Sequence, residues 1–210
     1  MKTRNIIIIV VSAIVVTFIL RILLVVGLVF LISNSSELEV NTDISKYNDY
    51  IFEKAKEKYR NKWDMDESIF PKNISNNVKV VDYKMVYYNP WDAQFLSYLV
   101  VDYDNSFDYQ IEVNRLNNYH STPYLGYYNV TGFSKYKLLA MYADSYNGFV
   151  YALTDNEQRI IYVELIFCNY FYDLDYKKYI DEDYLPDGFD ASNNNSYMRS
   201  MLKERIKWKQ

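Results

Sequence analysis

The chain opens with a long apolar segment and then changes to patterns typical of a folded domain. From Ile6 to Ile32 only four residues are not strongly hydrophobic, namely Ser12, Thr17, Arg21 and Gly27. As a helix this segment would extend about 40 Å at ~1.5 Å per residue, more than the ~30 Å hydrocarbon core of a bilayer. Residues 6–32 are therefore predicted to form a single transmembrane helix, with the lipid bilayer as its partner.

The charges on either side of this segment predict its orientation. Lys2 and Arg4 precede it, whereas acidic residues come before Lys46, the first cation after it. The positive-inside rule then leaves residues 1–5 as a cytoplasmic stub and exports the remainder of the chain.

A cleaved secretory signal is the alternative interpretation of the same segment. Such a signal has an apolar stretch of about 7–15 residues followed by a small-residue cleavage site. Here the stretch is longer, and Ser33-Asn34-Ser35 is a poor cleavage site. We expect an uncleaved signal-anchor in the cell membrane, then a short polar stalk over residues 33–41 and an extracytoplasmic domain over residues 42–210.

Two stretches of the exported part have the period of an amphipathic helix. Between residues 42 and 63, apolar residues recur at spacings of three and four, at Ile44, Tyr47, Ile51, Ala55, Tyr59 and Trp63. Residues 196–209 repeat the pattern with Met198, Met201, Leu202 and Ile206. The domain is expected to begin and end with a helix.

The stretch between these helices consists of short aromatic and β-branched runs separated by turn residues. The predicted strands are residues 78–88, 94–103, 107–116, 135–143, 149–154 and 159–170. Apolar and polar residues alternate strictly from Phe107 to Asn114, which indicates a strand with one solvated face. Residues 135–143 also fit a helix, but a hairpin follows directly and favours a strand. The last run is apolar on both faces, which indicates a central strand.

These elements predict an α+β fold. An amphipathic helix would pack on a mostly antiparallel sheet of about five strands, closed by a C-terminal helix. Cystatin-like and NTF2-like domains have this order of elements, which is an analogy of shape only.

Composition excludes several functional classes. With one His and one Cys, the exported part has neither a two-histidine zinc motif nor a cysteine pair. Its glycines form no phosphate-binding loop, and its 20 cations against 27 acids argue against nucleic acid. We expect no cofactor, no nucleotide and no nucleic-acid partner.

Carboxylates are the weak candidates for chemistry. Glu164 stands in an otherwise apolar run, where it could act with an acid from residues 173–190 in glycoside hydrolysis. The simpler interpretation pairs Glu164 with a Lys or Arg on a neighbouring strand, or with water at a sheet margin. Asp181, Asp183 and Asp187 are weak calcium candidates in an acidic loop whose spacing does not match an EF-hand; the default is a solvated loop.

Tyrosine is unusually frequent, with 24 residues that all lie beyond position 46. Tyrosine and tryptophan suit binding surfaces because they combine a flat apolar ring with a polar tip. The candidate binding residues are Tyr87, Tyr88, Trp91, Tyr124, Tyr127 and Tyr128. Asparagine is also abundant, so codon bias together with core packing is the competing explanation.

Three segments, residues 63–71, 87–92 and 149–169, resemble in general style uncharacterised single-span proteins of low-GC Gram-positive bacteria. The resemblance implies a layout of anchor and ectodomain and identifies no catalytic residue. The first hypothesis is a membrane-tethered domain, not an enzyme, that binds an envelope protein or a glycan through Tyr and Trp. The alternative is a small hydrolase of cell-wall glycan that uses Glu164.

Overall fold

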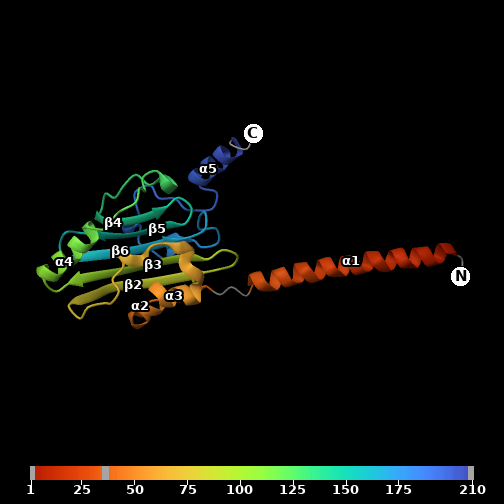
Figure 1. The fold of residues 1–210 in the computed structure, drawn as a ribbon, viewed down its shortest axis with the longest axis horizontal. Coiled ribbons are helices and arrows are strands. Elements are labelled where there is room, and N and C mark those ends of the chain that lie inside the picture. The colour runs from red at the N-terminus through yellow and green to blue at the C-terminus, as the bar shows by residue number, and fades with distance from the viewer. Residues whose placement is uncertain (1–2, 35–37, 208–210) are drawn as a thin grey trace. The chain divides into compact units, whose positions relative to one another are not determined.

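The computed structural model describes residues 3–34 and 38–207 and divides the chain into two units, residues 1–37 and 38–210. In the first unit the structure describes one helix, α1 (Thr3–Asn34), which confirms the helical conformation predicted for residues 6–32 (Figure 1). The structure describes the side chains of residues 14–29 of this helix. The large hydrophobic side chains among them are exposed to solvent, for example Leu23 at 60%. Within the described part of the chain, no helix is both long and apolar enough to cross a membrane.

The second unit is an α+β domain built on one antiparallel six-stranded sheet (Figure 1). Its strands are β1 (Glu39–Asn41), β2 (Val78–Tyr88), β3 (Gln94–Tyr103), β4 (Lys137–Asp144), β5 (Gly148–Thr154) and β6 (Arg159–Ile166). They are ordered β1-β2-β3-β6-β5-β4. The helices are α2 (Tyr47–Tyr50), α3 (Phe52–Tyr59), α4 (Ser106–Asn117) and α5 (Ser196–Lys207). The predicted α+β class is thus confirmed. The sheet has six strands, where about five were predicted.

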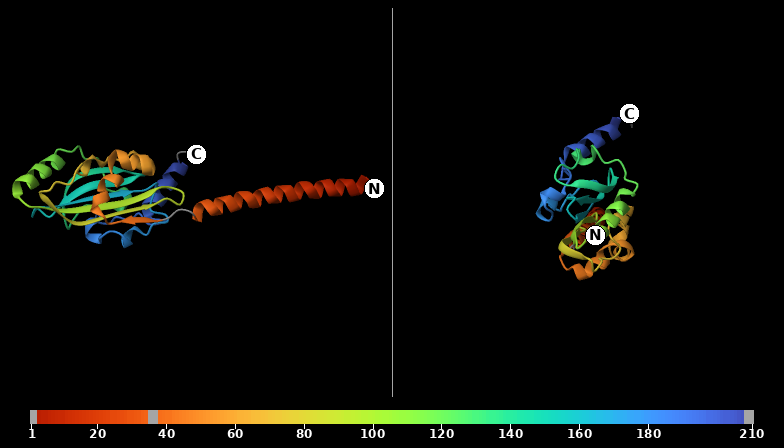
Figure 2. Two further views of the ribbon diagram at one scale, coloured as in Figure 1. Left: turned by 90° about the horizontal axis from the view of Figure 1, so that it is seen from below. Right: turned by 90° about the vertical axis from the view of Figure 1, so that its left-hand side faces the viewer.

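Both faces of the sheet are buried, each under a different part of the chain. On β6, Ile160 and Tyr162 belong to one hydrophobic cluster, while Ile161 and Val163 belong to the other. Residues 44–71 and α4 cover the first face, and residues 124–133 and 171–198 cover the second (Figure 2). The apolar run of β6 was predicted to be central, and it lies between β3 and β5.

One predicted strand is wrong, because residues 107–116 lie within helix α4. Asn105 caps this helix by accepting a hydrogen bond from the Asp108 amide at 2.9 Å. The residues that α4 buries, Tyr109 and Leu116, are seven positions apart, which is two helical turns. Phe107 is 73% exposed, so the alternating pattern did not mark a buried face.

The first amphipathic helix is also corrected. Residues 42–63 form α2, α3 and flanking 3₁₀ turns, because Ile51 is extended and Phe52 has a φ of 59°. Four of the six predicted inward positions, Tyr47, Ile51, Ala55 and Tyr59, are nonetheless buried. Ile44 and Trp63 are partly buried.

The chain termini of the domain differ from the prediction in detail. Glu39–Asn41, assigned to the stalk, pairs with β2, and residues 35–37 of that stalk lie outside the described part. The predicted C-terminal helix is confirmed as α5, but only Met198 of its four apolar positions is fully buried. Leu202 and Ile206 are more than half exposed, and positions 208–209 lie outside the described residues.

Candidate functional site

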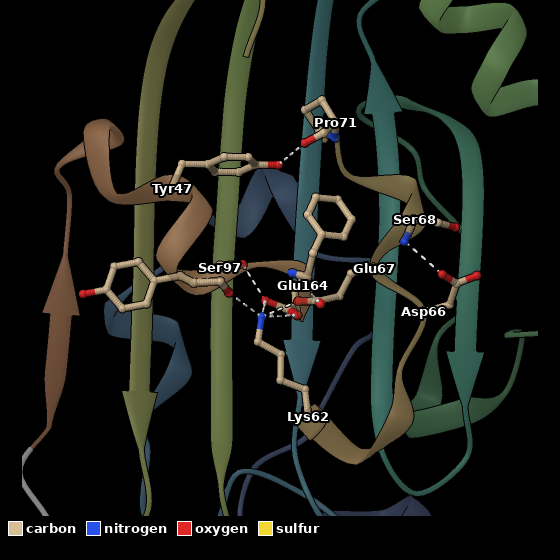
Figure 3. A network of polar contacts seen from close by, with 10 residues as sticks. Tyr47, Lys62, Asp66, Glu67, Ser68, Pro71, Ser97 and Glu164 are labelled. Carbon is tan, nitrogen blue, oxygen red and sulfur yellow. Dashed lines mark hydrogen bonds and ion pairs between the residues drawn. The ribbon is translucent and has the colours of Figure 1, made fainter. Parts of the chain in front are cut away.

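The most unusual feature of the domain is a group of charged side chains inside its core (Figure 3). Lys62, Glu67, Glu164 and Ser97 are exposed by 2%, 4%, 1% and 6%. The Lys62 ammonium donates to Glu67 Oε1 at 2.5 Å and to the two Glu164 oxygens at 2.9 and 3.0 Å. We call these four residues the Lys62 cluster.

Each remaining polar atom of the cluster has a partner. Lys62 Nζ also donates to the Tyr50 carbonyl at 2.7 Å, and the Phe52 amide donates to Glu67 Oε2 at 2.9 Å. The Ser97 hydroxyl donates to Glu164 Oε2 at 2.7 Å. Among the described residues, no buried side-chain nitrogen or oxygen lacks a hydrogen-bond partner. Such complete pairing is what allows charges to remain in a core.

Two different layers of the domain meet in this cluster. Glu164 and Ser97 are directly paired on the adjacent strands β6 and β3. Lys62 and Glu67 come from the segment that covers this face of the sheet, Lys62 from the turn Arg60–Asp64 and Glu67 from the turn Glu67–Ile69. The cluster therefore links the covering segment to the centre of the sheet.

The backbone that delivers Lys62 is strained. Lys62, Trp63 and Asp64 have φ values of 41°, 56° and 58°, the left-handed region. Such a conformation costs about 1–2 kcal/mol for each residue with a Cβ. The Trp63 indole donates to the Ala93 carbonyl at 3.0 Å and helps to hold the turn. Strain of this kind persists only where surrounding contacts impose it.

The electrostatics of the cluster favour a shared proton. Burial raises the pKa of the Glu67 carboxyl to about 7, and the Lys62 ammonium only partly offsets this effect. Burial lowers the pKa of Lys62, but the carboxylates of Glu164 and Glu67 outweigh it, so its pKa lies above the usual value. Of the two acids that contact the Lys62 ammonium, Glu67 is therefore the one whose burial makes it hold a proton more strongly than a solvent-exposed glutamate does.

Glu164, predicted as a weak catalytic candidate, lies in this cluster. Its hydrogen bonds run to Lys62 and Ser97, whereas the prediction placed it with an acid from residues 173–190. The simpler interpretation, a cationic partner for Glu164, is what the structure shows, although the cation comes from a turn and not from a neighbouring strand.

The predicted aromatic residues do not share one surface. Tyr87 packs with Tyr59 and Phe95 on the face of the sheet that holds the Lys62 cluster. Tyr88, Tyr124, Tyr127 and Tyr128 belong to the cluster on the opposite face, and Tyr128 is fully buried. Trp91, in the turn between β2 and β3, is 63% exposed.

The acidic loop makes local contacts. Asp181 accepts from the Asp183 amide, Asp183 pairs with Lys135 at 3.3 Å, and Asp187 accepts from Ser134 at 2.9 Å. Across the described residues, no three His, Cys, Asp or Glu side chains are grouped as a metal site.

The fold and the Lys62 cluster define the chain as a single α+β domain with a charged core, preceded by an apolar helix. Comparison with known proteins adds nothing to this description, because no family model, curated protein or solved structure matches the chain.

Proposed function

We propose that the chain is a membrane-tethered protein whose α+β domain works outside the cytoplasm as a binding module. The observation that supports the tether is α1. Its large hydrophobic side chains between residues 14 and 29 are 43–64% exposed. That stretch alone is shorter than the ~30 Å core of a bilayer, so the proposed span also needs the rest of the apolar sequence from Ile6 to Ile32. Such an apolar surface has no cost in lipid but a large cost in water. The flanking Lys2 and Arg4 favour a cytoplasmic N-terminus.

Membrane fractionation with protease treatment of intact cells tests the tether. The full chain is expected in the membrane fraction and resistant to alkaline carbonate, and external protease is expected to remove the domain. A matched variant with Leu20, Leu23 and Leu24 replaced by aspartate should leave the membrane, because each central aspartate costs about 3 kcal/mol on insertion. Wild-type chain found in the soluble fraction, or a domain protected in intact cells, would contradict the proposal.

The binding role is supported by exposed apolar side chains at one end of the sheet. Trp91 lies in the turn between β2 and β3, and β1 begins beside the end of β2, where Glu39 faces Tyr87. β6 ends at the same place, because Ile166 faces Phe95. The chain then continues through Tyr172, which is 57% exposed, to Leu174, whose amide donates to Gln94 Oε1 at the start of β3 at 3.2 Å. Exposed aromatic rings of this kind suit a glycan or a protein partner in the cell envelope.

The position of Glu164 is unsuited to glycan hydrolysis. Glu164 is 1% exposed, and its oxygens are occupied by Lys62 and Ser97. A glycosidic bond has to reach its general acid directly or through one water.

Replacing Trp91 tests the binding end. If Trp91 is an anchor, Trp91→Ala should weaken co-sedimentation of the detergent-solubilised full chain with purified cell-wall glycan at least about tenfold. Phe107→Ala, in which an aromatic ring exposed by 73% is removed from α4, is the matched control and should bind like wild type. Equal binding by the wild type and Trp91→Ala would exclude this surface. Wild type that fails to sediment would exclude a glycan partner.

A further inference from the structure

We propose that Lys62 and Glu164 form an amide bond with each other, so that a covalent cross-link joins the covering segment to the central strand of the sheet. The two residues lie 102 positions apart in the chain. The reaction is a condensation within one chain and requires no cofactor or second substrate.

The geometry brings the reacting atoms together. Lys62 Nζ lies 2.9 and 3.0 Å from the two oxygens of Glu164, and a nitrogen equally close to both oxygens is also close to the carbon between them. Both side chains are at least 98% buried, so neither group exchanges this contact for water. Holding reactants in such contact replaces a bimolecular encounter by a unimolecular step, with effective concentrations of about 10⁵ M or more.

The step balances without an oxidant or reductant. A deprotonated Lys62 amine places its lone pair on Cδ of Glu164, and the nitrogen–carbon bond forms. The nitrogen then loses a second proton. One oxygen of Glu164 gains two protons, the one that the ammonium gave up before the attack and the one that the nitrogen loses after it, and the carbon–oxygen bond breaks with its electron pair on that oxygen. One water molecule leaves, and an amide remains.

The other two members of the cluster fit the roles that this step needs. Glu67 Oε1 contacts Lys62 Nζ at 2.5 Å, so it accepts the proton that activates the amine and returns it to the leaving oxygen. Burial raises the pKa of Glu67 to about 7, which suits a group that accepts and returns a proton. The Ser97 hydroxyl, 2.7 Å from Glu164 Oε2, donates to the oxyanion of the tetrahedral intermediate.

The resting state of the cluster is charged, because the pKa of Lys62 is raised by its two carboxylates. The amine therefore forms only when a proton passes to Glu67. Burial assists this transfer, since a low-dielectric core favours a neutral amine and acid over two ions. A cross-link has to form once in each chain, so a slow reaction suffices.

The mass of the full chain, purified and unfolded in urea, tests the proposal. The cross-linked chain is expected to be lighter than its sequence by one water molecule. Trypsin should then yield one branched peptide in which residues 61–72 are joined to residues 160–177, because a modified Lys62 no longer directs cleavage. An ion pair alone would leave the chain at its sequence mass and overturn the proposal. A loss of water confined to residues 61–72, which would join Lys62 to Glu67, would overturn it as well.

Two variants show whether Glu67 promotes the cross-linking reaction or only helps the domain to fold. Glu67→Gln keeps the shape of the side chain but carries no exchangeable acid proton, so cross-linking should be about 100-fold slower. Glu112→Gln is the matched control, because Glu112 is a partly buried acid bonded to Arg115 and Tyr162, and its chain should cross-link like wild type. Circular dichroism confirms that both variants fold. A folded Glu67→Gln chain that cross-links at the wild-type rate would remove Glu67 from this role.

Discussion

Replacing Lys62 with methionine is expected to lower the free energy of unfolding by about 3–5 kcal/mol, the usual effect of removing one partner from a buried charge pair. The ammonium is the only donor in the Lys62 cluster that contacts both Glu67 and Glu164. Without it, two acids that are 4% and 1% exposed face each other in the core. A covalent amide to Glu164 would increase the loss, so this value is a lower limit.

Urea unfolding followed by circular dichroism measures the effect. Lys54→Met is the matched control, because Lys54 pairs with Asp49 at 3.3 Å on the surface, where the side chains are 70% and 55% exposed. An exposed pair contributes at most about 1 kcal/mol. If both variants lost equal stability, the Lys62 cluster would have no special role in the core.

The free energy of unfolding of the domain is expected to fall by about 3 kcal/mol as the pH rises from about 4.5 to 7. This is the contribution of the titration of Glu67 alone. The pKa of this carboxyl is about 7 in the folded chain against a usual value of 4.5, mainly because the group is buried. Between these values the unfolded chain releases the proton while the folded chain retains it. The contribution is therefore complete below pH 4.5 and is lost as the pH passes 7.

Unfolding in urea across this pH range, compared between the wild type and Glu67→Gln, isolates the effect. The variant has no carboxyl at position 67, so its free energy of unfolding should fall less steeply with pH. The comparison uses the change of this free energy with pH, so a difference in absolute stability between the two chains does not affect it. Carbon NMR of the Glu67 carboxyl gives the titration directly. Parallel slopes, or a titration near 4.5, would show that Glu67 carries an ordinary charge in the core.

The sheet was largely predictable, because its strands carry their signal locally. Residues 78–88 and 94–103 were predicted with the bounds that the structure has, and β6 was recognised as central because it is apolar on both faces. Helix α4 was missed because its apolar residues alternate by chance over a short run. The cap formed by Asn105 and Asp108 was the better signal, since an asparagine three residues before an acid is typical of a helix start.

The Lys62 cluster was only partly predictable. Glu164 stood out because a carboxylate in an apolar strand needs a partner, and a cation was expected. Lys62 could not be identified as that cation, because several other lysines precede it closely in the sequence. Only the left-handed turn over residues 62–64 directs it inward, and left-handed conformations at lysine, tryptophan and aspartate leave no clear mark in a sequence. Glu67, in a neighbouring turn, had no distinguishing pattern.

The high tyrosine content was open to two interpretations, an aromatic binding surface or codon bias together with core packing. Many of them pack inside the domain, among them Tyr59, Tyr128, Tyr151, Tyr162 and Tyr176, which are fully buried. Core packing therefore accounts for much of the tyrosine content. The exposed Trp91 remains the position from which the binding proposal is best tested.

The coupling free energy between Lys62 and Glu164 tests most directly whether the buried cluster holds the covering segment on the sheet. It is obtained from the unfolding free energies of the wild type, Lys62→Met, Glu164→Gln and the double variant. Because each single change leaves the other member of the pair without its partner, the double variant should be less destabilised than the two single effects added together, with a coupling of at least about 2 kcal/mol. A coupling below about 0.5 kcal/mol, the level of residues that do not interact, would contradict the account.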